Sequence, residues 1–274
     1  MRKFIAAAIQ LDSTADKEEN VRNVLGLIAE AAARGAKLVA MPEHMSYVGS
    51  ESRANAEEIP GGRTFQVMAE QAARHGVWLH CGSVYESSGD GRPYNTCMVI
   101  SPAGELAAKY RKIHMFDVCL KDGPTVKESD RAAPGDEIVT VDTGEVGVLG
   151  LSICYDIRFC ELYRLMALRG AQILLAPADF VLNTGKDHWE PILRARAIEN
   201  GCYVIAPAQC GVKSRFQAYG KSLIVDPWGN VIAKASDKPC VITAEIDLDY
   251  LEAVRSQVFT LQNRRTDVYK LTGA

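Results

Sequence analysis

The chain contains an internal repeat of one helix–strand unit. The segment Arg34-Gly-Ala-Lys-Leu-Val-Ala-Met-Pro42 recurs as Arg169-Gly-Ala-Gln-Ile-Leu-Leu-Ala-Pro177. In both copies a short apolar run ends at a proline, and the residues before it, 20–34 and 161–168, have apolar positions at helical spacing. A helix that leads into a buried strand twice in one chain predicts an α/β fold built from two related halves.

Other apolar runs predict strands throughout both halves, separated by turns that contain Gly and Pro. The predicted strands are 4–11, 37–41, 78–84, 96–101, 137–141, 147–153, 202–207, 221–225 and 241–246. Two long helices are predicted at 64–75 and 188–200. Because no Pro/Ser/Gly-rich linker divides the chain, we expect one domain over residues 1–274, with two stacked sheets and helices outside them.

The charge and hydropathy patterns exclude several classes of partner. The formal net charge is −3, and Lys and Arg are scattered rather than clustered, so we expect neither nucleic acid nor an anionic membrane as a partner. No apolar run approaches the roughly 18 residues of a membrane span. The opening run Phe4 to Ile9 is too short for a secretory signal, so we expect a cytoplasmic protein.

The cysteine spacing argues against a metal site. The eight cysteines form no C-x-x-C pair and join no paired-His pattern, so no metal is expected. In a cytoplasmic chain, disulfides are unexpected and most of these residues should be small buried hydrophobes. The sequence also lacks the glycine-rich nucleotide motifs and H-E-x-x-H, which removes the commonest nucleotide and zinc-protease interpretations.

One cysteine occupies a position typical of a nucleophile. The apolar run Val146-Gly-Val-Leu-Gly-Leu-Ser-Ile leads directly into Cys154, and polar residues and a helix follow. We expect a strand–turn–helix elbow there, with the pKa of the thiol lowered toward the reactive thiolate. The alternative is a buried core cysteine. Ser152 is a weaker candidate because the G-x-S-x-G pattern is broken at its last position.

A nucleophilic cysteine needs a base and a group that stabilises the oxyanion. None of the five histidines lies in a pattern that marks it as the base. Glu43 directly follows a buried strand and a proline, where a carboxylate is costly unless it is paired or used; the alternative is an exposed loop residue. Lys112 follows the segment Ala107-Ala-Lys-Tyr-Arg and is the candidate cation.

Taken together, these segments resemble the nitrilase superfamily of carbon–nitrogen hydrolases. Glu43, Lys112 and Cys154 match its Glu-Lys-Cys triad in the right order, and the similarity extends over residues 4–269. The other matching segments are Tyr94-Asn-Thr, Lys127-Glu-Ser129, Pro134-Gly-Asp136, Thr184-Gly-x-x-His-Trp-Glu190, Arg194-Ala-Arg-Ala-Ile-Glu199 and Asp226-Pro-Trp-Gly229.

The resemblance implies a four-layer αββα sandwich and a homodimer. It also implies a functional role for segment 117–134, which is polar and longer than most loops that only connect two elements. Glu128 in that segment matches the accessory glutamate of the family and should lie near Lys112.

The resemblance also limits the chemical class of the substrate. Tyr155-Asp156 replaces the Trp-Glu that follows the cysteine in nitrile-cleaving members, so an amide is expected. Arg158 and Thr184 match positions that bind a substrate carboxylate in the branch acting on deaminated glutathione and on ω-amides of α-keto acids. The alternative for Arg158 is an ion pair with Asp156. The segments 208–211, 219–220 and 226–229 are closer to the deaminated-glutathione amidases, whereas 44–58 and 212–218 depart from both patterns.

The implied enzyme is a cofactor-free amidase that works through a Cys154 thioester. Glu43 would act as the general base, Lys112 and the backbone N–H of Tyr155 would hold the oxyanion, and Glu128 would orient Lys112 or the substrate. Its partner would be a small carboxylate-bearing amide, with no metal or nucleotide. Two alternatives remain: a hydrolase of N-carbamoyl amino acids or aliphatic amides, and an inactive interaction protein on the same fold.

Overall fold

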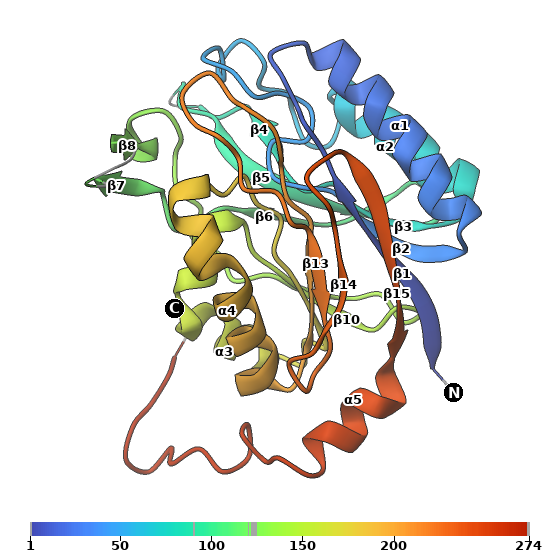
Figure 1. Cartoon of the computed structure of the whole chain (residues 1–274), viewed down its shortest axis with the longest axis vertical. Coiled ribbons are helices and arrows are strands. Elements are labelled where there is room, and N and C mark those ends of the chain that lie inside the picture. The colour runs from blue at the N-terminus through green and yellow to red at the C-terminus, as the bar shows by residue number, and fades with distance from the viewer. Residues whose placement is uncertain (1, 90, 120, 122–124, 273–274) are drawn as a thin grey trace.

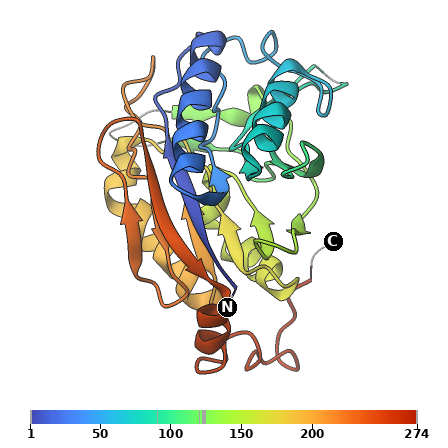
Figure 2. The same ribbon diagram turned by 90° about the vertical axis from the view of Figure 1, so that its right-hand side faces the viewer.

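The computed structural model describes residues 2–89, 91–119, 121 and 125–272. Two large sheets stack face to face, and a pair of helices covers the outer face of each sheet (Figure 1, Figure 2). The layers therefore follow the order α, β, β, α, as the sequence predicts.

The first sheet has seven strands in the order β15-β1-β2-β3-β5-β4, with β6 paired to β5. They are β15 (Cys240–Asp247), β1 (Lys3–Gln10), β2 (Ala36–Ala40), β3 (Trp78–His80), β5 (Tyr94–Ile100), β4 (Val84–Glu86) and β6 (Leu106–Arg111). Strands β1, β2 and β3 are parallel. Two helices, α1 (Lys17–Ala33) and α2 (Arg63–His75), make the crossovers between them and pack on the outer face.

The second sheet has six strands in the order β14-β13-β12-β11-β10-β9. They are β14 (Val231–Lys234), β13 (Leu223–Val225), β12 (Tyr203–Ala206), β11 (Ile173–Leu175), β10 (Val148–Leu151) and β9 (Thr140–Asp142). Strands β10, β11 and β12 are parallel, and α3 (Cys160–Leu168) and α4 (Leu182–Asn200) connect them. The sequence repeat is thus the pair α1–β2 and α3–β11, each strand lying between two parallel neighbours.

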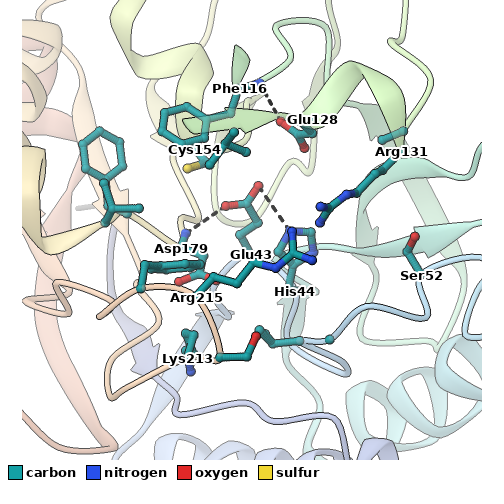
Figure 3. Close-up of a pocket in the computed structure, with 18 of the residues that line it drawn as sticks. Glu43, His44, Ser52, Phe116, Glu128, Arg131, Cys154, Asp179, Lys213 and Arg215 are labelled. Atoms are coloured by element: carbon teal, nitrogen blue, oxygen red, sulfur yellow. Dashed lines mark hydrogen bonds and ion pairs between the residues drawn. The ribbon is translucent and has the colours of Figure 1, made fainter. Parts of the chain in front are cut away.

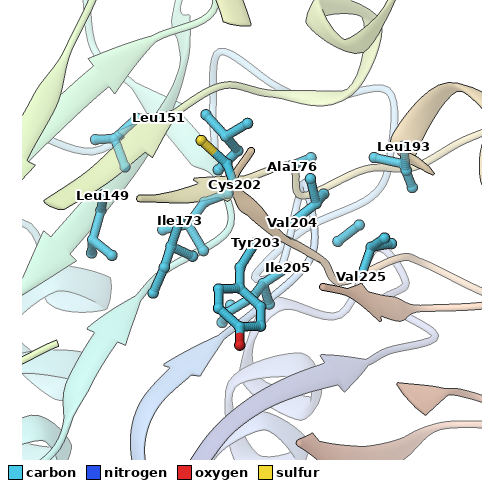
Figure 4. Packing of buried hydrophobic residues seen from close by; sticks show 14 of the residues in the cluster. Leu149, Leu151, Ile173, Ala176, Leu193, Cys202, Tyr203, Val204, Ile205 and Val225 are labelled. Atoms are coloured by element: carbon cyan, nitrogen blue, oxygen red, sulfur yellow. The ribbon is translucent and has the colours of Figure 1, made fainter. Parts of the chain in front are cut away.

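The alternation of side chains along the strands produces the layers. In β1, Ala6 and Ala8 face the second sheet, whereas Ala7 and Ile9 face α1 and α2. The larger apolar cluster fills the space between the sheets and beneath α3 and α4, and Figure 4 shows its part around β10, β11 and β12. Small side chains on β1 let the two sheets approach closely, and both faces of each sheet are covered.

Several elements differ from the sequence predictions. The predicted strand 78–84 is two strands, because the chain turns at Gly82, where an added Cβ would lie 1.9 Å from the Pro42 carbonyl oxygen. Helix α4 begins at Leu182 rather than 188. Strands β6 and β14 and the helix α5 (Leu248–Arg255) were not predicted.

The predicted loop 117–134 contains a short hairpin. Strand β7 (Asp117–Cys119) pairs with β8 (Thr125–Lys127), and the 3₁₀ turn η1 (Glu128–Asp130) follows. Residues 120 and 122–124 of this segment lie outside the described residues. The turn begins at Glu128, so the hairpin places that carboxylate over the ends of the sheet strands.

Candidate active site

Four segments of the chain meet beside the strand ends of the two large sheets, and Figure 3 shows three of their residues, Glu43, Glu128 and Cys154. Glu43 lies three residues after β2, Lys112 directly after β6, and Cys154 three residues after β10. Glu128 comes from the hairpin segment. The carboxyl ends of parallel strands gather at one edge of a sheet, which explains why residues far apart in sequence converge there.

Cys154 is held in a strained elbow, as predicted. It begins the 3₁₀ turn η2 (Cys154–Arg158) with φ 49°, a value that residues other than Gly rarely adopt. Asp156 holds this geometry: it is fully buried and accepts hydrogen bonds from the Ile153 N–H at 2.8 Å and the Tyr110 hydroxyl at 2.7 Å. His114 Nδ1 lies 2.7 Å from the same carboxylate. Asp156 thus holds the elbow in place, whereas the sequence analysis considered it only as an ion-pair partner of Arg158.

The carboxylate of Glu43 is the centre of the site. Its Oε1 lies 3.1 Å from Lys112 Nζ and accepts a hydrogen bond from Asn95 Nδ2 at 2.9 Å. Its Oε2 accepts the Asp179 backbone N–H at 2.8 Å. Lys112 also donates to both oxygens of Glu128, at 3.1 and 2.8 Å. Glu43 is 2% exposed and Lys112 1% exposed, so these charges interact with little screening.

The electrostatics of the site favour a neutral thiol and an ionised glutamate. Burial raises the pKa of Glu43, but the charge of Lys112 and the hydrogen bonds from Cys154 and Lys112 together lower it to about 2. Burial, together with the Glu43 charge, raises the pKa of Cys154 well above its usual value. The predicted lowering of the thiol pKa is therefore wrong. The physical reason is that burial and the neighbouring Glu43 charge both disfavour the thiolate, and together they outweigh its attraction to Lys112.

The pKa of Lys112 moves in the opposite direction from that of most buried lysines. Burial lowers it, but the negative charges of Glu128 and Glu43 outweigh burial and raise it well above its usual value. The ammonium therefore stays charged at neutral pH. Glu128 is itself held by the backbone N–H of Phe116 at 2.6 Å, which fixes the carboxylate beside the cation.

A cavity of about 240 Å³ opens above these groups. The predicted residues Glu43, Lys112, Glu128, Cys154 and Thr184 all line it. The Oγ1 atom of Thr184 is buried without a hydrogen-bond partner among the described residues. Such a hydroxyl is free to bind a polar group of a substrate. Tyr155 is the second residue of η2, and the first N–H groups of a helical turn have no partner within the turn.

Arg158 lies outside the wall of this cavity. Its guanidinium carbon is 5.1 Å from the centre of the Phe180 ring, and its Nη1 is 3.3 Å from His188 Nδ1. The alternative role as an ion-pair partner of Asp156 is not what the structure shows, because Tyr110 and His114 bind that carboxylate. Phe180 itself lines the cavity, so the Phe180 ring separates Arg158 from the cavity.

Two further cavity residues carry unusual chemistry that the sequence did not reveal. His44 has φ 56°, stacks on Tyr85 at 4.9 Å, and places Nε2 3.8 Å from Glu43 Oε1. Burial lowers the pKa of His44 and keeps its ring neutral. Burial also raises the pKa of Asp179 to about 7. For His44, the only signal in the sequence is that it directly follows Glu43.

The described residues contain neither a cluster suited to a metal ion nor a helix suited to a membrane. Within them, no group of three or more His, Cys, Asp or Glu side chains is arranged to hold a metal ion. No described helix is both long and apolar enough to span a membrane. All eight cysteines are free thiols.

A four-layer sandwich with Glu, Lys and Cys at its strand ends is the arrangement of a carbon–nitrogen hydrolase. The family model described as carbon-nitrogen hydrolase matches residues 5–256, so the chain belongs to this family.

Individual relatives are similar over nearly the whole chain. The chain is 42% identical to a deaminated glutathione amidase of Synechocystis sp., covering 96% of this chain and 99% of that protein. It is 41% identical to omega-amidase NIT2 of Homo sapiens, covering 98% of each. The crystal structure of the C. elegans NitFhit protein is similar with a TM-score of 0.91 and 37% identity, over 99% of this chain and 67% of that one. The predictions of this family, of the αββα fold and of a hydrolase of the amidase kind are confirmed.

Proposed function

We propose that this chain hydrolyses the amide of a small carboxylate-bearing substrate through a thioester on Cys154. The observation that carries the proposal is the position of the Glu43 carboxylate, which contacts the ammonium of Lys112 and interacts with the Cys154 thiol. A buried base beside a neutral thiol and a permanent cation provides the groups that acyl transfer requires. Glu128 keeps Lys112 in place.

The reaction takes place in two halves. Glu43 removes the thiol proton while the sulfur of Cys154 attacks the amide carbon, and Lys112 and the Tyr155 N–H stabilise the oxyanion. The C–N bond breaks, the amine leaves with the proton from Glu43, and a thioester remains. Glu43 then takes a proton from water, which attacks the thioester; the C–S bond breaks and the thiolate recovers that proton. These steps need no metal and no cofactor.

We propose an α-keto acid ω-amide or deaminated glutathione as the substrate. Two of the relatives are named for these activities. The hydroxyl of Thr184 has no hydrogen-bond partner among the described residues, which supports a polar contact to the acyl half of such a substrate. The positive charge of Arg158, which lies behind Phe180, supports a carboxylate on that half. A guanidinium there carries a permanent positive charge, which favours a carboxylate on the substrate side of Phe180.

Release of ammonia or amine from five amides and nitriles tests this function. Purified protein should act on α-ketoglutaramate or deaminated glutathione in preference to an N-carbamoyl amino acid, a neutral aliphatic amide and a nitrile. Preference for one of the last three contradicts the carboxylate substrate. Inactivity on all five, together with an unreactive Cys154, favours the interaction protein instead.

Cys154 should react with iodoacetamide faster than the other seven thiols. Cys119 and Cys160 are exposed, whereas Cys154 is 6% exposed, so accessibility alone predicts the opposite order. Iodoacetamide enters the site as an amide, and Glu43 can take the thiol proton there. Peptide mass spectrometry after brief labelling measures the order. Faster labelling of Cys119 or Cys160 would contradict the assignment of the nucleophile.

Replacing Arg158 with Met should raise KM roughly 10-fold for a carboxylate-bearing amide, because the guanidinium behind Phe180 attracts the carboxylate through space. The KM for a neutral amide should change much less. Steady-state kinetics on α-ketoglutaramate and on a neutral aliphatic amide provide the comparison. An equal change for both substrates would mean that Arg158 only packs against Phe180 and His188.

We further propose that residues 1–274 form one domain that assembles as a homodimer in the cytoplasm. Apolar side chains remain exposed on the α4 face, where Ile198 and Trp228 are each 50% exposed and Gly229 packs on Ile198. Exposed apolar patches of this kind commonly mark interfaces. The eight free thiols suit a reducing compartment.

A further inference from the structure

The charged groups at the bottom of the pocket are paired with one another. Glu43 and Glu128 share the ammonium of Lys112. Lys213 is buried, and its Nζ lies 2.8 Å from Asp12 Oδ1 and donates to the Ser13 carbonyl at 2.9 Å. Lys112 and Lys213 are therefore already neutralised by carboxylates of this chain, and neither is free to pair with a carboxylate of the substrate.

Two cations at the mouth of the pocket have no such partner. Arg131 and Arg215 both line the pocket and are exposed. Within the part of the chain that the structure describes, neither guanidinium forms an ion pair or a hydrogen bond. The third cation of the rim, Lys127, pairs with Asp130 at 3.3 Å. Asp179, the remaining acidic residue of the wall, has a pKa of about 7 and is only partly charged at neutral pH.

The two guanidinium groups approach the same place from different segments. Arg131 follows the turn η1, and Arg215 lies in the connection between β12 and β13. In Figure 3 both side chains extend toward His44, and Glu43 lies between them and Cys154. Two cations that face one cavity repel each other, and an anion between them relieves that repulsion.

Their position assigns them to one half of the substrate. Glu43 delivers the proton to the departing nitrogen, so the amine half of the substrate must lie on the Glu43 side of the thiol. Arg131 and Arg215 extend to that side. Thr184, the residue proposed for the acyl half, comes from α4 and a different part of the wall.

We propose that Arg131 and Arg215 form an anion site for the amine half of the substrate. This inference rests on the proposed function and makes it more specific. The preferred substrate is then a secondary amide whose leaving amine carries a carboxylate, such as a short peptide, rather than a primary amide that releases ammonia. Deaminated glutathione belongs to this class because its leaving group is cysteinylglycine, whereas α-ketoglutaramate releases ammonia.

Three amides with the same acyl half test the site. They are deaminated glutathione, its C-terminal carboxamide and α-ketoglutaramate, and formation of α-ketoglutarate is measured for each. The double variant Arg131→Met/Arg215→Met should raise KM for deaminated glutathione roughly 10- to 100-fold, with kcat nearly unchanged. The other two amides, which lack the second carboxylate, should respond much less. Arg74→Met, an exposed arginine of α2, is the matched control.

The outcomes separate this inference from the proposed function. An unchanged KM for deaminated glutathione in the double variant overturns the anion site, as does an equal rise for all three amides. Wild-type protein that hydrolyses only α-ketoglutaramate also overturns it, while the proposed amidase stands. Wild-type protein that hydrolyses none of the three contradicts the proposed function and this inference together.

Discussion

Replacing Glu43 with Gln should lower kcat/KM by about 10²–10⁴, the usual contribution of a general acid–base group. The thiol of Cys154 has a pKa well above its usual value, so almost none of it is ionised at neutral pH without a base. Glutamine retains the shape of the side chain and can still accept hydrogen bonds from Asn95 and Lys112, but it cannot take a proton. The loss should therefore appear in the rate and not in the stability of the fold.

The pH dependence of this variant distinguishes a base from a structural residue. Because the pKa of Glu43 is about 2, the wild-type base is ionised throughout the neutral range. In Glu43→Gln the residual rate should instead rise about tenfold per pH unit until the thiol titrates, because only free thiolate can then attack. Rates from pH 6 to 9 on α-ketoglutaramate measure this slope. Glu58→Gln, an exposed residue, is the control, and near-normal activity of Glu43→Gln would contradict the role of the base.

Replacing Lys112 with Arg should lower kcat by about 10²–10³, the usual effect of losing one oxyanion donor. The Nζ atom lies within 2.8–3.1 Å of three carboxylate oxygens of Glu43 and Glu128. The side chain is 1% exposed, so the site has no space for a wider planar guanidinium in the same position. Arginine retains the charge, but its donors point in different directions and the oxyanion loses its partner.

The same change in a neighbouring residue shows whether the effect is local. Lys109 lies on β6 three residues before Lys112 and contacts Glu86 at 2.6 Å in a half-exposed position. Lys109→Arg should leave kcat nearly unchanged. Circular dichroism and thermal unfolding of both variants show whether the fold survives. A Lys112→Arg protein with normal kcat would mean that this lysine only neutralises the two glutamates.

The sequence singled out Glu43, Lys112 and Cys154, which the fold brings to one cavity, but it did not predict the electrostatics of that group. Strand ends and a proline identified Glu43, and the apolar run before Cys154 identified the elbow. The lowered thiol pKa was wrong, because the net effect on Cys154 depends on burial and on the distances to two opposite charges. Those distances arise between residues that are up to 111 positions apart in the chain, and no local pattern contains them.

The sequence also did not reveal the roles of the residues that contact Glu43 and the Cys154 turn. Asn95 was part of a matching segment without a role, and Asp156 was weighed only as a partner of Arg158. In the structure Asn95 donates to Glu43, and Asp156 binds Tyr110 across the interface between the two sheets. The anion site proposed for Arg131 and Arg215 also depends on two segments that meet only in the folded chain.

By itself, the sequence determined the layers of this protein. Alternating apolar residues, helical spacing and the repeated unit are local patterns, and burial of apolar surface on both faces of each sheet leaves the αββα sandwich as their solution. Only the tertiary structure decided the protonation of the thiol, the place of Arg158 behind Phe180, and which cations remain unpaired at the pocket mouth. The physical reason is that hydrophobic patterning acts along the chain, whereas pKa values and ion pairing depend on short through-space distances in a buried site.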